Sequence, residues 1–294
     1  MSEPVNDLRN PAYEDETDLR EIWQVLVKYK RMIFSSVFVA ALLAAGISMM
    51  LPNIYRAEVL LVPVRSEDAK GGGMAAALGN FGGLASLAGI SLGRGGSTEE
   101  NLAVLKSREF LWKFVQENKL MPILFEDEWD GARNKWEEDD PEDQPGKMDV
   151  ARLFYEDVLN VGADKKSSLV TVSLDWTDPK LAAVWVDRLV AQLNQHLRLQ
   201  AIALSENNLK YLNEELARTQ VEEMRKTLFD LIGQEQKNAM LANAQREFAF
   251  RVLDPAVVPD KKIKPKRAII ILLAALLAGF AAVMIAFIDN RRKV

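Results

Sequence analysis

Two apolar segments without a single charge decide the fold of this 294-residue chain. Residues 32–51 read MIFSSVFVAALLAAGISMML, and residues 268–288 read AIIILLAALLAGFAAVMIAFI. As helices, each would reach about 30 Å, the thickness of the hydrocarbon core of a bilayer. The sequence therefore predicts an α+β membrane protein in which two transmembrane helices, 32–51 and 268–288, flank a domain at 52–267 that is long enough to have its own core.

Basic residues lie at both ends of these segments, so charge alone does not orient them. Lys28, Lys30 and Arg31 precede the first segment, and residues 291–293 (RRK) follow the second. The central domain, however, also ends in basic residues directly before the second segment, at 261, 262, 264, 266 and 267. The first helix usually dominates, and long loops translocate largely regardless of charge. We therefore predict a bacterial inner-membrane protein with two cytoplasmic tails, 1–31 and 289–294, and a periplasmic domain at 52–267. Tail 1–31 would carry a short interfacial helix. A cleaved signal peptide is disfavoured because the first segment starts late and is long.

The composition argues against catalysis. There is no cysteine and only one histidine, His196, which removes thiolate nucleophiles and sites built on cysteine or histidine pairs. The formal net charge of −5 argues against nucleic acid as a partner, and no phosphate-binding glycine motif occurs. We expect no enzyme, no cofactor, no metal site and no catalytic residue. His196 is predicted to be a packing or surface residue of a helix.

The central domain alternates strand and helix patterns. Residues 55–64 (YRAEVLLVPV) and 168–176 have strand chemistry, and 248–258 is a third candidate strand. A capping pattern at residue 97 begins a helix predicted to reach Asn118, and a further helix is predicted at 149–159. These elements predict an α/β base formed by about 52–176 and 248–260.

Residues 180–247 form one long helical tract without proline. A single helix of this length would span about 100 Å and could not return to the membrane before residue 268. We therefore predict a break at 205–208 or at 233–238. A narrow apolar stripe needs a partner helix, from this chain or from another copy. Its residues are candidate oligomer contacts: Leu209, Leu212, Leu216, Met224 and Leu228.

Two segments have biased composition. Residues 71–96 are rich in glycine, and although 74–92 lack charge, they lack the large apolar residues of a membrane span, so a loop that grazes the membrane or is simply flexible is favoured. Residues 126–143 are strongly acidic. They lack the ligand spacing of a calcium loop, so a solvated loop is the stronger interpretation.

The connector to the second apolar segment combines prolines with basic residues. Pro255, Pro259 and Pro265 should keep it extended, and Lys266 and Arg267 end it, after lysines at 261, 262 and 264. Anchoring among anionic lipid headgroups is favoured over contact with a lipid-linked glycan or a polymerase. Gly46 and Gly279 are candidates for close packing of the membrane helices, with ordinary packing an equal alternative.

Several motifs, in order along the chain, resemble the Wzz-type polysaccharide chain-length determinants, also called polysaccharide co-polymerases. They are 17–31 (TDLREIWQVLVKYKR) leading into a span, 55–59 (YRAEV), 103–110 (AVLKSREF), 176–183 (WTDPKLAA) with Leu193-Asn194, and the proline-basic connector. The resemblance implies a homo-oligomer in the inner membrane with long helices on a periplasmic base. It also implies a function: setting the modal length of a polymer made on a lipid carrier, beside a separate polymerase and without catalysing transfer.

Some features depart from that family. The six-residue tail differs from relatives that carry a fused cytoplasmic tyrosine kinase, and the glycine-rich and acidic segments are not part of the minimal pattern. A component of a capsule or exopolysaccharide export complex is the alternative function. A two-span sensor is a third hypothesis, for which the tails offer little room.

Overall fold

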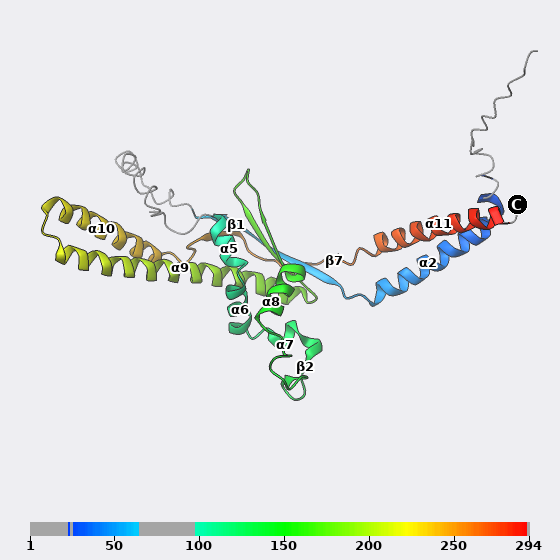
Figure 1. The fold of residues 1–294 in the computed structure, drawn as a ribbon, viewed down its shortest axis with the longest axis horizontal. Coiled ribbons are helices and arrows are strands. Elements are labelled where there is room, and N and C mark those ends of the chain that lie inside the picture. Colours follow the sequence, from blue (N-terminus) through cyan, green and yellow to red (C-terminus); the bar gives the residue numbers. More distant parts are fainter. Residues whose placement is uncertain (1–22, 24–25, 65–97, 293–294) are drawn as a thin grey trace, which may run out of the picture. The chain divides into compact units, whose positions relative to one another are not determined.

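The computed structural model describes residue 23 and residues 26–64 and 98–292. The predictions for the glycine-rich segment 71–96 and for most of tail 1–31 lie outside the described residues. The chain forms two compact units, one made of residues 1–53 and 263–294 and the other of residues 54–262. They are described in turn (Figure 1).

The first unit is a pair of antiparallel helices, α2 (Lys30–Met50) and α11 (Arg267–Arg292). Both are long and apolar enough to cross a membrane. Small side chains are buried between them, Ala44 and Ser48 on α2 and Ala282 and Ala286 on α11, whereas large apolar side chains point outward. Such a surface suits lipid rather than water.

Both helices include some of the basic residues that flank the apolar segments. α2 begins at Lys30 and α11 continues to Arg292, beyond the predicted limits of 32 and 288. Lysine and arginine are good helix formers, and Arg291 and Arg292 lie in the last turn, where positive charge is favourable.

An antiparallel sheet forms the base of the second unit. Its strands β1 (Ile54–Pro63), β4 (Leu159–Ala163), β5 (Val170–Trp176) and β6 (Phe250–Asp254) follow the order β4-β5-β1-β6. Val59 lies opposite Val172 and Tyr55 opposite Trp176. A short strand, β7 (Lys262–Lys264), lies where the two units meet in the sequence.

Helices cover the sheet and complete the core. They are α5 (Thr98–Leu105), α6 (Arg108–Glu117), α8 (Lys147–Leu153), the π-helical turn η2 (Phe154–Val158) and the first half of α9 (Pro179–Arg218). Fully buried Phe110, Phe114, Phe154 and Trp185 join Leu61 of the sheet in one cluster. The predicted fold class, a mixed domain between two membrane-type helices, is confirmed.

The predicted helix from residue 97 to Asn118 is two helices. α5 ends at Leu105 and α6 begins at Arg108, because Ser107 adopts an extended backbone and its Oγ accepts a hydrogen bond from the N–H of Phe110 at 3.2 Å. This is an N-cap, which starts a new helix. The periodicity spans the break because both helices face the same core.

The long helical tract folds into a hairpin of α9 and α10 (Glu222–Ala244), which lie side by side (Figure 1). The turn is formed by residues 219–221, so both predicted breaks were wrong. Ser205 is buried inside α9, and Gly233 lies within α10 without interrupting it. Asn208, in the same predicted break as Ser205, donates from Nδ2 to Glu235 Oε1, which lies in the other predicted break on α10, at 3.4 Å.

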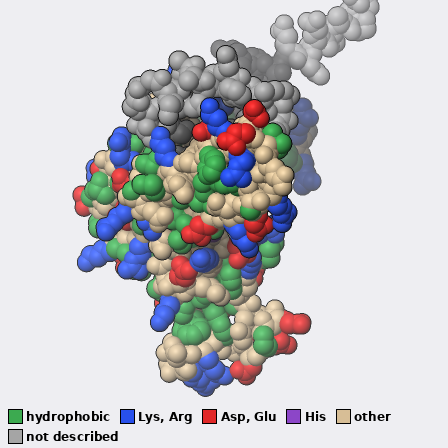
Figure 2. Space-filling model, turned by 90° about the vertical axis from the view of Figure 1, so that its left-hand side faces the viewer, with side chains coloured by type: hydrophobic (Ala, Val, Ile, Leu, Met, Phe, Trp, Pro, Cys, Tyr) green, Lys and Arg blue, Asp and Glu red, His purple; other side chains and the backbone are tan. Residues whose placement is uncertain are grey.

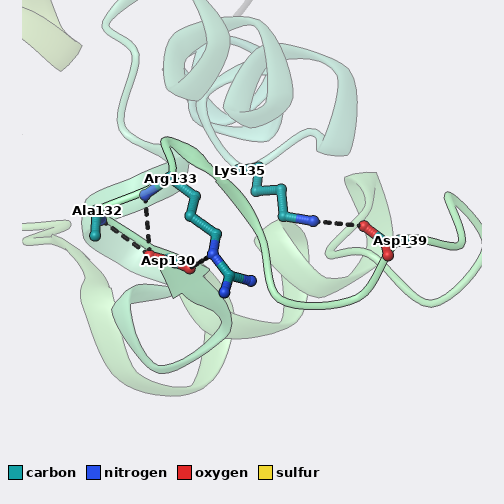
Figure 3. Close-up of polar contacts among 5 residues, drawn as sticks. All are labelled: Asp130, Ala132, Arg133, Lys135 and Asp139. Carbon is teal, nitrogen blue, oxygen red and sulfur yellow. Dashed lines mark hydrogen bonds and ion pairs between the residues drawn. The ribbon is translucent and has the colours of Figure 1, made fainter.

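The acidic segment is more ordered than the loop predicted for it. After α7 (Met121–Leu124) and η1 (Glu126–Glu128), strands β2 (Trp129–Asp130) and β3 (Lys135–Trp136) form a small hairpin. The rings of Trp129 and Trp136 pack edge to face, with their centroids 4.9 Å apart. Figure 3 shows that Arg133 pairs with Asp130 and Lys135 with Asp139, so basic residues neutralise part of the acidic charge.

Candidate functional site

The connector residues predicted from the sequence lie on both sides of the boundary between the units. In the second unit, Pro255 is exposed and Pro259 half-buried. In the first unit, Lys266 is exposed just before α11, and Arg267 Nη2 donates to Asn53 Oδ1 at 3.3 Å. Arg267 therefore ties the start of α11 to the residues after α2, whereas Lys266 remains available to a phosphate. A role of these residues in binding stays a prediction.

The opposite end of the helix pair is also held by polar contacts. Tyr29 Oη donates to Asp289 Oδ2 at 2.9 Å, and Lys28 Nζ donates to Asn290 Oδ1 at 3.0 Å. These partners are about 260 residues apart in the sequence, so no local pattern pointed to them. Asp289, the acidic residue that directly follows the second apolar segment, thereby has a hydrogen-bond donor.

One of the two candidate glycines lies at the helix–helix contact. A Cβ on Gly279 would lie 3.4 Å from Val37 Cγ2, whereas a Cβ on Gly46 would have nothing within 4 Å. A methyl group at 279 would thus meet Val37 at about ordinary van der Waals distance, so Gly279 lies in the helix–helix contact without being required for it.

The predicted oligomer contacts lie on the α9–α10 hairpin. Leu209, Leu212, Leu216 and Leu228 are half-buried, whereas Met224 is 54% exposed. Leu209 borders the same groove as Ala239 and Asn243 of α10. The partner helix that the stripe requires is therefore largely supplied by the chain itself, and contacts between copies stay a prediction.

Other apolar residues of the hairpin are more exposed than the stripe. Leu204, Tyr211, Phe229 and Met240 are each more than half exposed. Seen from the turn of the hairpin, hydrophobic side chains lie in small areas between mixed acidic and basic ones (Figure 2). The sequence could have indicated these residues, because they are apolar at positions outside the stripe, where a solvated helix normally carries polar residues.

A half-exposed arginine paired with a buried carboxylate links β1 to β5 in register. Arg56 Nε and Nη2 donate to the two carboxylate oxygens of Asp175 at 2.6 and 2.8 Å, and Asp175 is 2% exposed. The hydrogen bond to this carboxylate raises the pKa of Arg56. Because the two residues are register partners, a slip of the strands would leave the buried carboxylate unpaired.

A buried amide joins α9 to the chain returning from the hairpin. Asn194 Oδ1 accepts from the N–H groups of Ala249 and Phe250, both at 2.9 Å, and Nδ2 donates to the Phe250 carbonyl at 2.8 Å. One side chain thus serves three backbone groups beside β6. The sequence showed this asparagine only as part of the Leu193-Asn194 pair.

His196 packs against the base of the second unit. Its ring lies 5.7 Å from that of Phe110. Burial lowers its pKa, Lys113 adds to the lowering, and Glu117 opposes it. A neutral, packed imidazole fits the predicted packing role.

Two family models match the chain in order. The model of the Wzz chain length determinant protein matches residues 15–118, and the GNVR model, described as a "G-rich domain on putative tyrosine kinase", matches residues 214–291. The chain thus carries a Wzz-type region toward its N-terminus and a GNVR-type region toward its C-terminus. The matched parts contain α2, β1, α5 and α6 in the first case, and α10, β6, the connector and most of α11 in the second.

Two solved structures are distantly similar to this chain. A full-length bacterial polysaccharide co-polymerase is 14% identical with a TM-score of 0.41, covering 94% of this chain and 98% of that one. A fragment of WzzB, a polysaccharide co-polymerase from Salmonella Typhimurium, is 14% identical with a TM-score of 0.31, covering 72% and 100%. No curated protein is significantly similar.

Two of the Wzz-like motifs are helix starts. In 103–110 (AVLKSREF), Leu105 is fully buried and Ser107 caps α6. In 176–183 (WTDPKLAA), Asp178 Oδ1 accepts from the N–H groups of Lys180 and Leu181 at 2.7 and 3.3 Å, and Pro179 occupies the first position of α9. Both motifs therefore set where a helix begins, which is a structural reason for their residue types.

Proposed function

We propose that this protein is a Wzz-type chain-length determinant and sets the modal length of a surface polysaccharide that is assembled on a lipid carrier. Chain-length regulation is the general function of the Wzz family, and the observation that carries it here is the Wzz match, on a chain whose two apolar helices flank a mixed domain. It acts with a polymerase in the inner membrane and does not itself catalyse transfer. Both termini are cytoplasmic, and the domain at 52–267 is periplasmic.

Copies of the chain associate around the membrane normal through their helical hairpins. Support comes from the exposed apolar residues of α9 and α10, which a lone helical hairpin in water would not be expected to carry in such number. The assembly restrains the polymerase and the growing glycan, so that extension stops near a preferred length. Lys266 lies among lipid headgroups or contacts the phosphate of the lipid-linked glycan.

The first experiment is a gel profile of surface polysaccharide from cells with and without the gene. We expect the polymer to persist in the deletion strain but to lose its preferred length. Complete loss of surface polymer would instead support the export component that shares this layout. An unchanged profile would contradict both functions.

The hairpin contacts have a separate test. Phe229→Asp should shift or broaden the length distribution and lower the oligomer size in detergent, because Phe229 is 55% exposed; its ring contact is with Arg225, 5.9 Å from the ring centroid. Leu212→Asp is less informative, because half-buried Leu212 also packs within the hairpin. Lys226→Asp, a charge reversal at an exposed position of the same helix, is the control. An unchanged distribution and oligomer size in stably expressed Phe229→Asp would contradict the contact.

A further inference from the structure

A cavity of about 540 Å³ lies in the second unit, between one face of α9 and the chain that returns from the hairpin. Helix α9 contributes residues at 187, 190, 191, 194, 195 and 198, which repeat at helical spacing. The returning chain contributes Arg246, Glu247, Val252 and Pro255. The volume lies within the range of sites that hold a small molecule.

The acceptor side chains of this cavity each place at least one oxygen in a hydrogen bond to its walls. Asp187 Oδ1 accepts from the N–H of Ala256 at 3.1 Å, and Glu247 Oε1 accepts from the N–H of Val252 at 3.3 Å. Asn194 holds the backbone of Ala249 and Phe250, as described above. Asp187 and Asn194 therefore fix the returning chain against α9, and Glu247 braces the returning chain itself, so the cavity is a preformed one.

The two arginines that line the cavity, in contrast, are not held by acidic partners. Arg198 and Arg246 form no ion pair within the part of the chain that the structure describes. Arg198 Nε is buried and has no hydrogen-bond partner there. A buried donor without an acceptor is unfavourable, and a planar guanidinium is suited to bind a carboxylate or phosphate through two parallel hydrogen bonds.

We propose that this cavity binds a saccharide unit that carries an anionic group, a carboxylate or a phosphate, with Arg198 and Arg246 as the donors to that group. The volume far exceeds that of a bare oxyanion. The apolar wall formed by Val190, Val252 and Pro255 suits the C–H face of a sugar ring, and the exposed Gln195 amide suits its hydroxyls. The inference names a ligand class for this chain and rests on its proposed role with a polysaccharide.

The test is saturation-transfer NMR on the full chain in lipid nanodiscs, with empty nanodiscs as the blank. The probes are glucuronate, glucose 6-phosphate, glucose and inorganic phosphate, the last used as a competitor. We expect both acidic sugars to receive saturation, glucose to bind at least fivefold more weakly, and phosphate to compete only at higher concentration.

Arg198→Gln and Arg246→Gln should each raise the dissociation constant for glucuronate at least fivefold. Arg218→Gln, an exposed arginine on the same helix but outside the cavity, is the matched control and should bind as the parent does. Should a glutamine variant fail to fold, Arg198→Lys keeps the charge but loses the two-pronged donor, and it should also weaken binding.

Three results would overturn the inference: no saturation of glucuronate, equal binding of glucose, or binding that the Arg198 and Arg246 variants do not alter. Full displacement by equimolar phosphate would show a simple oxyanion site and overturn the saccharide part. The gene deletion separates this outcome from the general function. If the deletion still abolishes the preferred polymer length while glucuronate does not bind, only the cavity assignment fails.

Discussion

At the scale of single residues, Asn194 holds three backbone groups at a point where the chain, after leaving the base in α9, returns to it beside β6. It is 4% exposed, so water would not readily replace it. Each buried backbone group left unsatisfied costs about 1–3 kcal/mol. We expect Asn194→Ala to lower the free energy of unfolding by about 3 kcal/mol in chemical denaturation, whereas Asn207→Ala, exposed on the same helix, should change it by less than about 0.5 kcal/mol. Equal effects of the two variants would show that the amide is dispensable.

His196 gives a second prediction at this scale, because it is the only histidine of the chain. Its pKa is lowered in the folded state, chiefly by burial, so the unfolded state binds the proton first as pH falls. The stability it contributes is therefore present above its ordinary pKa of 6.5 and is lost as pH falls from that value toward the lower, folded pKa. When the pH falls from 7.5 to 5.5, the melting temperature of the parent should drop further than that of His196→Gln. The same loss in both proteins would assign the pH dependence to carboxylates.

At the scale of elements, local hydrophobic pattern was sufficient to predict the two membrane-type helices, β1 and β5. It failed at the turn of the hairpin, because residues 219–221 (TQV) contain neither glycine nor proline. The turn is held instead by Arg225, whose Nη1 donates to the carbonyls of Leu216 and Thr219 at 3.2 and 3.1 Å. The sequence did not predict the cavity either, because its two walls are some 50 residues apart along the chain and no periodicity relates them.

The same arginine provides a test of the turn. Arg225→Ala removes both contacts and should cost about 1 kcal/mol of local stability, which corresponds to roughly fivefold faster hydrogen exchange of the amides at 219–225. The effect should stay within the hairpin, because the base has its own core. Lys226→Ala, at an exposed position beside it, should leave exchange unchanged. Acceleration that spreads to β5 would mean that hairpin and base open together.

At the scale of the whole molecule, the proposed function depends on which side of the membrane the central domain occupies, and positive charge at both helix ends does not decide this. The lack of native cysteine makes a direct test possible. Lys165→Cys lies on an exposed turn of the central domain, and Arg291→Cys lies at the exposed end of α11. In intact spheroplasts, a membrane-impermeant maleimide should label the first variant and leave the second unlabelled until detergent is added. The reverse pattern would put the base and its cavity in the cytoplasm, where an assembly acting on a polymer outside the inner membrane could not reach it.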